Sequence, residues 1–204
     1  AACTAATLST LDSVGDVGRY TSITIGADGL GLISYYDDTN DDLKVAHCSN
    51  AACTIATLST LDSASTVGWY TSIATGVDGL GLISYYHWTT GDLKVAHCSN
   101  AACTTATIST LDSAGNVGEF TSMAIGADDL GLISYWDNTN SALKVAHCSN
   151  AACTTATVST LDTGVVGFLT SIAIGTDGLG LISYYEFIND ALKVAHCSNA
   201  PCTT

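Results

Sequence analysis

One sequence unit accounts for almost the whole chain, and it occurs four times. The phrase LKVAHCSNAACT begins at Leu43, Leu93 and Leu143, and it returns at Leu192 as LKVAHCSNAPCT. Other segments, such as STLD and LGLISY, repeat in step with it. Tandem units of about 20–50 residues stack on one another because none can bury its apolar surface alone. We therefore predict one domain over residues 1–204, with repeats at 1–50, 51–100, 101–150 and 151–199 and a partial repeat at 200–204.

Each unit carries the signals of four short strands. In the first copy we expect them at residues 21–26, 30–36, 43–49 and 53–61, which are rich in β-branched and aromatic residues. Turn residues separate the strands, and the Asp28-Gly29 pair is typical of a β-hairpin. No segment shows the period of about 3.6 residues that marks a helix. The chain is predicted to be all-β.

A four-stranded antiparallel meander repeated every 40 to 50 residues or so is typical of a β-propeller blade. Each blade packs against a neighbour on both faces, which suits strands such as GLISYY that are apolar or small on both sides. A β-solenoid is the alternative, although its coils are usually shorter. We predict a four-bladed propeller.

On this repeated four-strand unit, the chain resembles secreted bacterial β-propeller repeat proteins. Its size is similar to that of the four-bladed hemopexin-like propellers. The resemblance implies architecture alone, because the sequence holds no catalytic or ligand motif of a particular family.

The repeat is split between the two ends of the sequence. The fourth-strand segment Cys3–Leu11 comes first, and the third strand of the last unit is expected at Leu192–Ser198. We expect these segments to pair and complete the last blade, within one chain or between chains, because pairing would cover an open sheet edge. The alternative is that the chain is a piece of a longer array.

Eight of the nine cysteines form four pairs with nearly identical surroundings. Each pair flanks the turn before a fourth strand, which favours a short hairpin disulfide. A metal site that includes His47 is the alternative, but zinc sites mostly use another spacing, and we expect no metal or cofactor. Disulfides indicate an extracellular protein, secreted or on the cell surface. The predicted pairs are Cys48/Cys53, Cys98/Cys103, Cys148/Cys153 and Cys197/Cys202, which leaves Cys3 unpaired or linked to another segment.

Charge and hydropathy each exclude one kind of partner. The chain has 19 Asp and Glu against 5 Lys and Arg, a net charge of −14, so it should repel nucleic acid. No apolar run reaches the 18 or so residues of a membrane helix, so we expect no membrane insertion. Recurrent acids such as Asp28 and Asp62 are expected to bond local backbone. The expected partners are further copies of the chain, a glycan or a protein.

The copies differ mainly in two connections, residues 14–20 and 37–42 of the first copy and their counterparts. A meander brings these two connections to one end of the blade. Aromatic side chains on such loops suit contacts with sugars or proteins, whereas drift in tolerant loops is the alternative. The candidate ligand-binding residues are Arg19, Tyr20, Trp69, Tyr70, His87, Trp88, Glu119, Phe120, Trp136, Phe168 and Phe187.

Enzyme motifs such as G-x-S-x-G, H-E-x-x-H and a phosphate-binding loop are absent from the sequence. The acids mostly recur fourfold, whereas catalysis needs an asymmetric site, so we expect no catalytic residues. The main prediction is an extracellular, non-enzymatic structural or adhesive protein that self-assembles through its split blade, for instance into filaments. The alternatives are a lectin-like module that binds carbohydrate or protein through the varied loops, and a glycosidase that uses two carboxylates.

Overall fold

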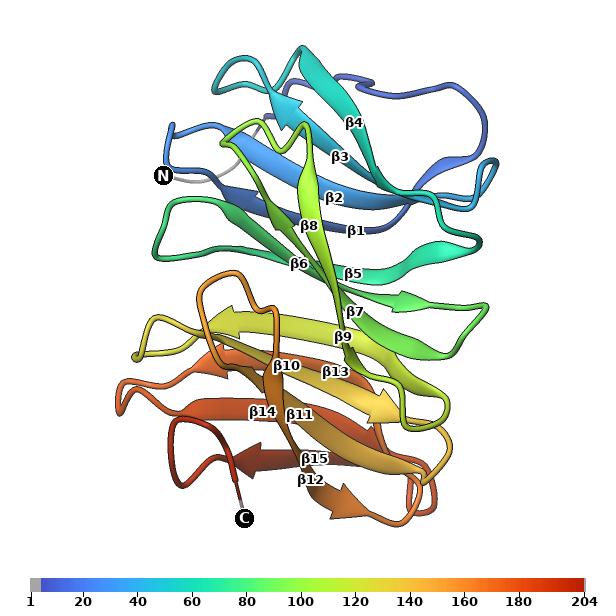
Figure 1. Cartoon of the computed structure of the whole chain (residues 1–204), viewed down its shortest axis with the longest axis vertical. Helices are drawn as coiled ribbons and strands as arrows, with labels where there is room; N and C mark the ends of the chain where they lie inside the picture. Colours follow the sequence, from blue (N-terminus) through green and yellow to red (C-terminus); the bar gives the residue numbers. More distant parts are fainter. Residues whose placement is uncertain (1–4, 204) are drawn as a thin grey trace.

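The computed structural model describes residues 5–203, and in this range it contains 15 strands and no helix. The strands form four antiparallel sheets in which consecutive strands pair, and we call these sheets blades 1 to 4 (Figure 1). Blades 1 to 3 have four strands each, and blade 4 has three. The all-β, bladed prediction is confirmed.

The strands of each blade follow in chain order. Blade 1 comprises β1 (Val17–Ile25), β2 (Gly31–Asp37), β3 (Asp42–Cys48) and β4 (Ala56–Asp62). Blade 2 comprises β5 (Val67–Thr75), β6 (Gly81–His87), β7 (Asp92–Cys98) and β8 (Ala106–Asp112). Blade 3 comprises β9 (Val117–Ile125), β10 (Gly131–Asp137), β11 (Ala142–Cys148) and β12 (Ala156–Thr163). Blade 4 comprises β13 (Val166–Ile174), β14 (Gly180–Glu186) and β15 (Ala191–His196).

An apolar core lies between each pair of successive blades. Between blades 1 and 2, Leu43 and Val45 pack with Ile73, Ile83 and Tyr85. Counterparts of these residues form the cores between blades 2 and 3 and between blades 3 and 4. We call the face with which blades 1 to 3 pack on the next blade the forward face, and the face with which blades 2 to 4 pack on the previous blade the backward face; the equivalent faces of blades 4 and 1 keep these names. Blade 1 lies at one end of the molecule and blade 4 at the other (Figure 1).

An ion pair with a tyrosine joins each blade to the next, and it is buried between blades 1 and 2 and between blades 2 and 3. The Asp62 carboxylate, at the end of β4, accepts hydrogen bonds from Tyr85 Oη at 2.6 Å and Lys94 Nζ at 2.5 Å in blade 2. Burial raises the pKa of Asp62, but the bonds from Lys94 and Tyr85 more than offset it, so the pKa lies below its usual value. Asp62 also bonds the backbone of Ala64 as predicted, and its contact with the next blade is an additional role.

The first and fourth strands differ in extent from the prediction. β1 begins at Val17 rather than at residue 21, because Gly18 and Tyr20 adopt positive φ angles of 92° and 53° and shift the pairing with β2. These irregular residues hide the strand pattern in the sequence. β4 begins at Ala56 rather than at residue 53, since Cys53 has a φ of 49° and belongs to the disulfide turn.

The four predicted disulfides are confirmed: Cys48–Cys53, Cys98–Cys103, Cys148–Cys153 and Cys197–Cys202. Cys3 lies outside the described residues. Four disulfides indicate an extracellular environment. Over residues 5–203, no helix is long and apolar enough to cross a membrane.

The prediction left two routes open for completing blade 4, and within residues 5–203 the N-terminal segment does not complete it inside the chain. The described part of that segment, residues 5–11, forms no strand, and the blade 4 sheet has three strands. Asp12 instead bonds Tyr35 and Lys44 of blade 1, as Asp62 bonds blade 2. These contacts hold the segment beside blade 1, and Leu8 remains exposed.

Candidate functional site

The two variable connections of each blade meet at one end, as predicted. A backbone amide of the second connection bonds a carbonyl of the first connection in every blade. The pairs are Asp38 N to Asp16 O, Trp88 N to Thr66 O, Asn138 N to Asn116 O and Phe187 N to Val165 O, at 2.8 to 3.1 Å. The scaffold is therefore constant at this end, while its side chains differ.

Three positions at this end vary together, and we call them the variable triad of a blade. They are positions 16, 19 and 38 in blade 1, 66, 69 and 88 in blade 2, 116, 119 and 138 in blade 3, and 165, 168 and 187 in blade 4. In blade 1 the triad is ionic, because Arg19 bonds Asp16 at 2.6 Å and Asp38 at 2.8 Å. In blade 3 it is polar, and Glu119 Oε1 accepts hydrogen bonds from Asn116 Nδ2 at 3.2 Å and Asn138 Nδ2 at 2.9 Å.

The triads of the other two blades are built on aromatic rings. Blade 2 has Thr66, Trp69 and Trp88, and the two indole rings pack at a tilt with centroids 4.5 Å apart. Blade 4 has an aromatic pair, Phe168 and Phe187, with centroids 6.1 Å apart. The two tryptophan rings therefore pack directly against one another.

A row of aromatic residues lines the inner strands next to the triads. Tyr20, Tyr70 and Phe120 occupy equivalent positions with φ angles of 53° to 55°, and their rings lie 4.7 and 4.5 Å apart in succession. Together with Leu169, these residues line a hollow of about 310 Å³. Burial raises the pKa of the Tyr70 hydroxyl, and nearby Tyr20 and Glu119 add to this effect. This hollow holds no carboxylate among its lining residues.

A second hollow, of about 490 Å³, lies between blades 2 and 3, and we call it the Trp88–Glu119 hollow. The Trp88 side chain is 52% exposed, whereas Glu119 is buried. Tyr86 Oη donates a hydrogen bond to Asn116 Oδ1 at 2.6 Å, and burial together with the Glu119 charge raises the pKa of Tyr86 to about 12. The lining residues are Tyr86, Trp88, Thr89, Thr90, Gly91, Asn116, Glu119 and Asn138.

The structure brings two of the predicted site residues, Trp88 and Glu119, into this hollow, with Trp69 behind Trp88. His87 is buried, and its ring bonds Ala64 O and Thr90 Oγ1. Trp136 packs against Phe168 with centroids 4.0 Å apart. The other predicted residues, Arg19, Tyr20, Tyr70, Phe120 and Phe187, are not among those that line the Trp88–Glu119 hollow.

Sequence reasoning missed Asn116 and Asn138, which hold the Glu119 carboxylate. The available signal was joint variation, since positions 116, 119 and 138 differ together from their counterparts in the other copies. Asparagine in a loop is common because it forms turns, so these two residues did not stand out.

The hollow combines an apolar wall with hydrogen-bonding groups. An exposed indole offers a flat apolar face, while carboxylate and amide groups bond hydroxyls. Binding pockets commonly combine an apolar wall with a few placed polar groups. Across residues 5–203, no group of three His, Cys, Asp or Glu side chains could hold a metal ion.

No protein-family model matches the chain, and no curated protein does either. Solved structures do match. An alpha-L-arabinofuranosidase from Lactobacillus brevis has a TM-score of 0.58 at 10% identity, over 87% of this chain and 67% of that one. The Dos1 propeller has a TM-score of 0.51 at 13% identity, over 82% of this chain and 41% of that one. The chain has a β-propeller fold.

A third neighbour covers nearly the whole chain. It is an exo-beta-1,3-galactanase from Phanerochaete chrysosporium with beta-1,3-galactotriose, with a TM-score of 0.63 at 10% identity over 97% of this chain and 51% of that one. Our chain thus spans about half the length of the galactanase. At this level of identity, the likeness shows the fold alone.

These neighbours contradict the prediction of a structural or adhesive protein without enzymatic activity, because two of the three are glycoside-cleaving enzymes by name. The prediction rested on the fourfold recurrence of the acids. One acid does not recur: Glu119 stands where the other copies have Arg19, Trp69 and Phe168, and the structure buries it beside Asn116 and Asn138.

Proposed function

We propose that this protein is a secreted, glycosidase-type β-propeller that binds a saccharide in the Trp88–Glu119 hollow and cleaves a glycosidic bond there. The observation that carries the proposal is the pairing of an exposed indole with a buried carboxylate in one hollow. The enzymes of similar fold support the reaction class, and the four disulfides support secretion.

Trp88 serves as the platform for a sugar ring. Its indole packs on that of Trp69, with centroids 4.5 Å apart, so the platform is held on one side, while Trp88 as a whole is half-exposed. A rigid aromatic surface gives contact area at a low cost in conformational entropy. The hydroxyls of Thr89 and Thr90 at the same hollow can bond sugar hydroxyls.

Glu119 provides the first carboxyl group of the reaction. Both asparagine amides bond Oε1, so we assign Oε2 to the ligand. Glycoside hydrolysis uses two carboxyl groups, one that protonates the leaving oxygen and one that activates water or attacks the sugar. We assign the second role to Asp92, because its carboxylate accepts a hydrogen bond from the hollow-lining Thr90 Oγ1 at 2.6 Å.

The test is hydrolysis of nitrophenyl glycosides, beginning with α-L-arabinofuranoside and β-D-galactoside, and of β-1,3-galactotriose. We expect Glu119→Gln and Asp92→Asn each to lower kcat/KM by about 100-fold or more, the usual contribution of general acid–base catalysis. Glutamine at 119 still accepts both asparagine bonds, so the fold should survive.

The matched control is Glu186→Gln, which removes a carboxylate of the same end of the molecule that bonds Asn189 in blade 4. Its activity should equal that of the wild type. Absence of turnover with every substrate, or full activity of Glu119→Gln, would contradict the proposal. Binding of a saccharide without turnover would keep the site and remove the hydrolytic role.

A further inference from the structure

Blade 4 exposes the apolar face that the other blades bury. On the forward face of blade 4, Leu181 is 43% exposed, Leu192 80% and Val194 58%. Their counterparts in blade 1 are 1%, 0% and 0% exposed, because blade 2 covers them. These counterparts are Leu32, Leu43 and Val45. Blade 4 therefore presents a complete inter-blade surface to which none of residues 5–203 contributes the second half.

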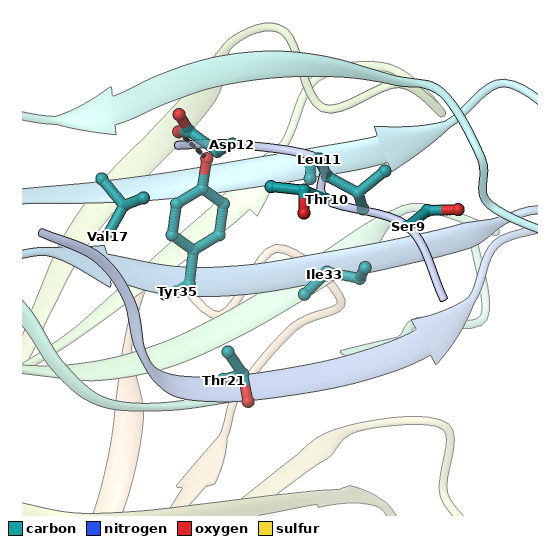
Figure 2. A pocket seen from close by; sticks show the side chains of 10 residues that line it. Ser9, Thr10, Leu11, Asp12, Val17, Thr21, Ile33 and Tyr35 are labelled. Atoms are coloured by element: carbon teal, nitrogen blue, oxygen red, sulfur yellow. Dashed lines mark hydrogen bonds between the residues drawn. The ribbon is translucent and has the colours of Figure 1, made fainter. Parts of the chain in front are cut away.

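Blade 1 exposes the complementary half on its backward face. Ile23 is 62% exposed, whereas its counterparts Ile73 and Ile172 are 6% and 8% exposed between blades. Beside this face lies an apolar hollow of about 360 Å³, to which residues 9–12 and Ile33 contribute. Figure 2 shows Leu11, Ile33 and Tyr35 around it.

Gly18 lines this hollow, and its counterparts in the other blades show which side chain fits there. A Cβ atom at Gly68, Gly118 or Gly167 would lie 2.7 to 2.8 Å from the Cα of Leu43, Leu93 or Leu143 of the preceding blade. A Cβ at Gly18 would meet nothing within 4 Å. At each of the three inter-blade joints one leucine packs against a glycine, and none of residues 5–203 takes that place beside Gly18. Leu192 is the leucine of this series that blade 4 exposes.

The N-terminal segment already lies where a fourth strand belongs. Asp12 bonds Tyr35 at 2.8 Å and Lys44 at 2.6 Å, which reproduces the joint of Asp62 with Tyr85 and Lys94. Residues 5–12 therefore stand beside blade 1 as β4 stands beside blade 2. Among residues 5–203, no third strand pairs with this segment.

We propose that a second copy of this chain docks head to tail, with blade 4 of one copy on blade 1 of the other. Residues 5–11 pair with β15 of the neighbouring copy, and Leu192 of that copy fills the hollow beside Gly18. A second copy fits because the two faces lie at opposite ends of one molecule (Figure 1) and repeat a joint that the chain already makes three times. Pairing also covers an open edge strand. The proposal is independent of the proposed function.

The experiment is light scattering of the full chain after size exclusion, at 10 to 100 µM or so of protein. We expect a mass of twice 20.8 kDa or a larger multiple. Leu192→Glu and Ile23→Glu should each weaken association by about tenfold or more, since each buries a charge in the joint. The control is Val77→Glu, because Val77 is 60% exposed and belongs to neither face.

Mixing the variants makes the test directional. The Leu192→Glu copy keeps an intact blade 1 and the Ile23→Glu copy an intact blade 4, so the mixture should form a one-to-one dimer although each variant alone is monomeric. Circular dichroism checks that both variants fold. A monomeric wild type overturns the proposal. Amide hydrogen exchange of β15 then shows whether that strand is open or is covered by closure within the chain, and either result leaves the proposal overturned. An oligomer that neither variant weakens overturns it as well.

Discussion

Asn138 Nδ2 donates a hydrogen bond to Glu119 Oε1 over 2.9 Å, and so joins the β10–β11 connection to the first strand of blade 3. The counterparts of this pair are Arg19 with Asp38, Trp69 with Trp88, and Phe168 with Phe187, and each pair is in contact. The partners have therefore changed together while the backbone has stayed the same. Each blade therefore carries its own set of contacting side chains on the same backbone at this end of the molecule.

If the triads are interchangeable, the ionic triad of blade 1 should work in blade 3. We expect Glu119→Arg alone to destabilise the fold by about 2 kcal/mol, because it leaves a charge without a partner at a buried position. Adding Asn116→Asp and Asn138→Asp restores the partners seen around Arg19 and should recover most of the loss. Urea unfolding measures both variants. A triple variant no more stable than the single one would refute interchangeability.

The buried ion pair between blades gives a second prediction. Asp62→Asn should lower the free energy of unfolding by about 3 kcal/mol, because Lys94 then lies buried without its counter-charge. The matched variant is Asp162→Asn, where Lys193 is 36% exposed, and its loss should be smaller. Equal losses at the two sites would show that burial does not set the strength of this joint.

The same carboxylates predict the acid limit of stability. Burial raises the pKa values of Asp62 and Asp112, but bonds from lysine and tyrosine more than offset it and lower both pKa values below 3.8. Near pH 4 the unfolded chain therefore binds more protons than the folded one, so their contribution is present above this pH and is lost as pH falls through the folded pKa values. Unfolding in urea at pH 6, 5, 4 and 3 should show this decline. In Asp62→Asn the decline should be shallower, and an identical slope would count against the assignment.

Backbone geometry beside the variable end gives a third stability test. Gly118 has a φ of 99°, and a Cβ there would lie 2.7 Å from the Leu93 Cα, so Gly118→Ala should cost about 3 kcal/mol or more. Gly29 has a φ of 76° but open space around it, so Gly29→Ala should cost about 1 kcal/mol. The difference isolates the contact between blades, and similar costs would show that φ alone matters.

Much of the fold could be predicted from the sequence because repeats and turn residues are local signals. The Asp28-Gly29 turn joins two strands that follow one another in the sequence, and the two cysteines of each disulfide are five residues apart. The start of β1 could not be predicted, because Gly18 and Tyr20 interrupt its alternation with positive φ angles. The position of residues 5–11 depends on the contact of Asp12 with blade 1, which no local pattern shows.

The site could be predicted only in part. Glu119 and Trp88 attracted attention because they differ from their counterparts, and aromatic side chains on loops suit ligands. The sequence did not show that His87 is buried, that Trp69 supports Trp88, or that two asparagines hold Glu119. These relations join different connections and successive strands, so they appear only when the blade is assembled.

The most direct test of the saccharide site is calorimetric titration of oligosaccharides into the wild type and into Trp88→Ala. The panel should include β-1,3-galactotriose and arabinose oligomers. We predict that the wild type binds at least one of them and that Trp88→Ala weakens its affinity about tenfold or more, the effect of losing an aromatic platform. Phe187→Ala, an exposed ring of the corresponding position in blade 4, should bind as the wild type does. Absence of binding across the panel, or equal affinity of the wild type and Trp88→Ala, would contradict the account.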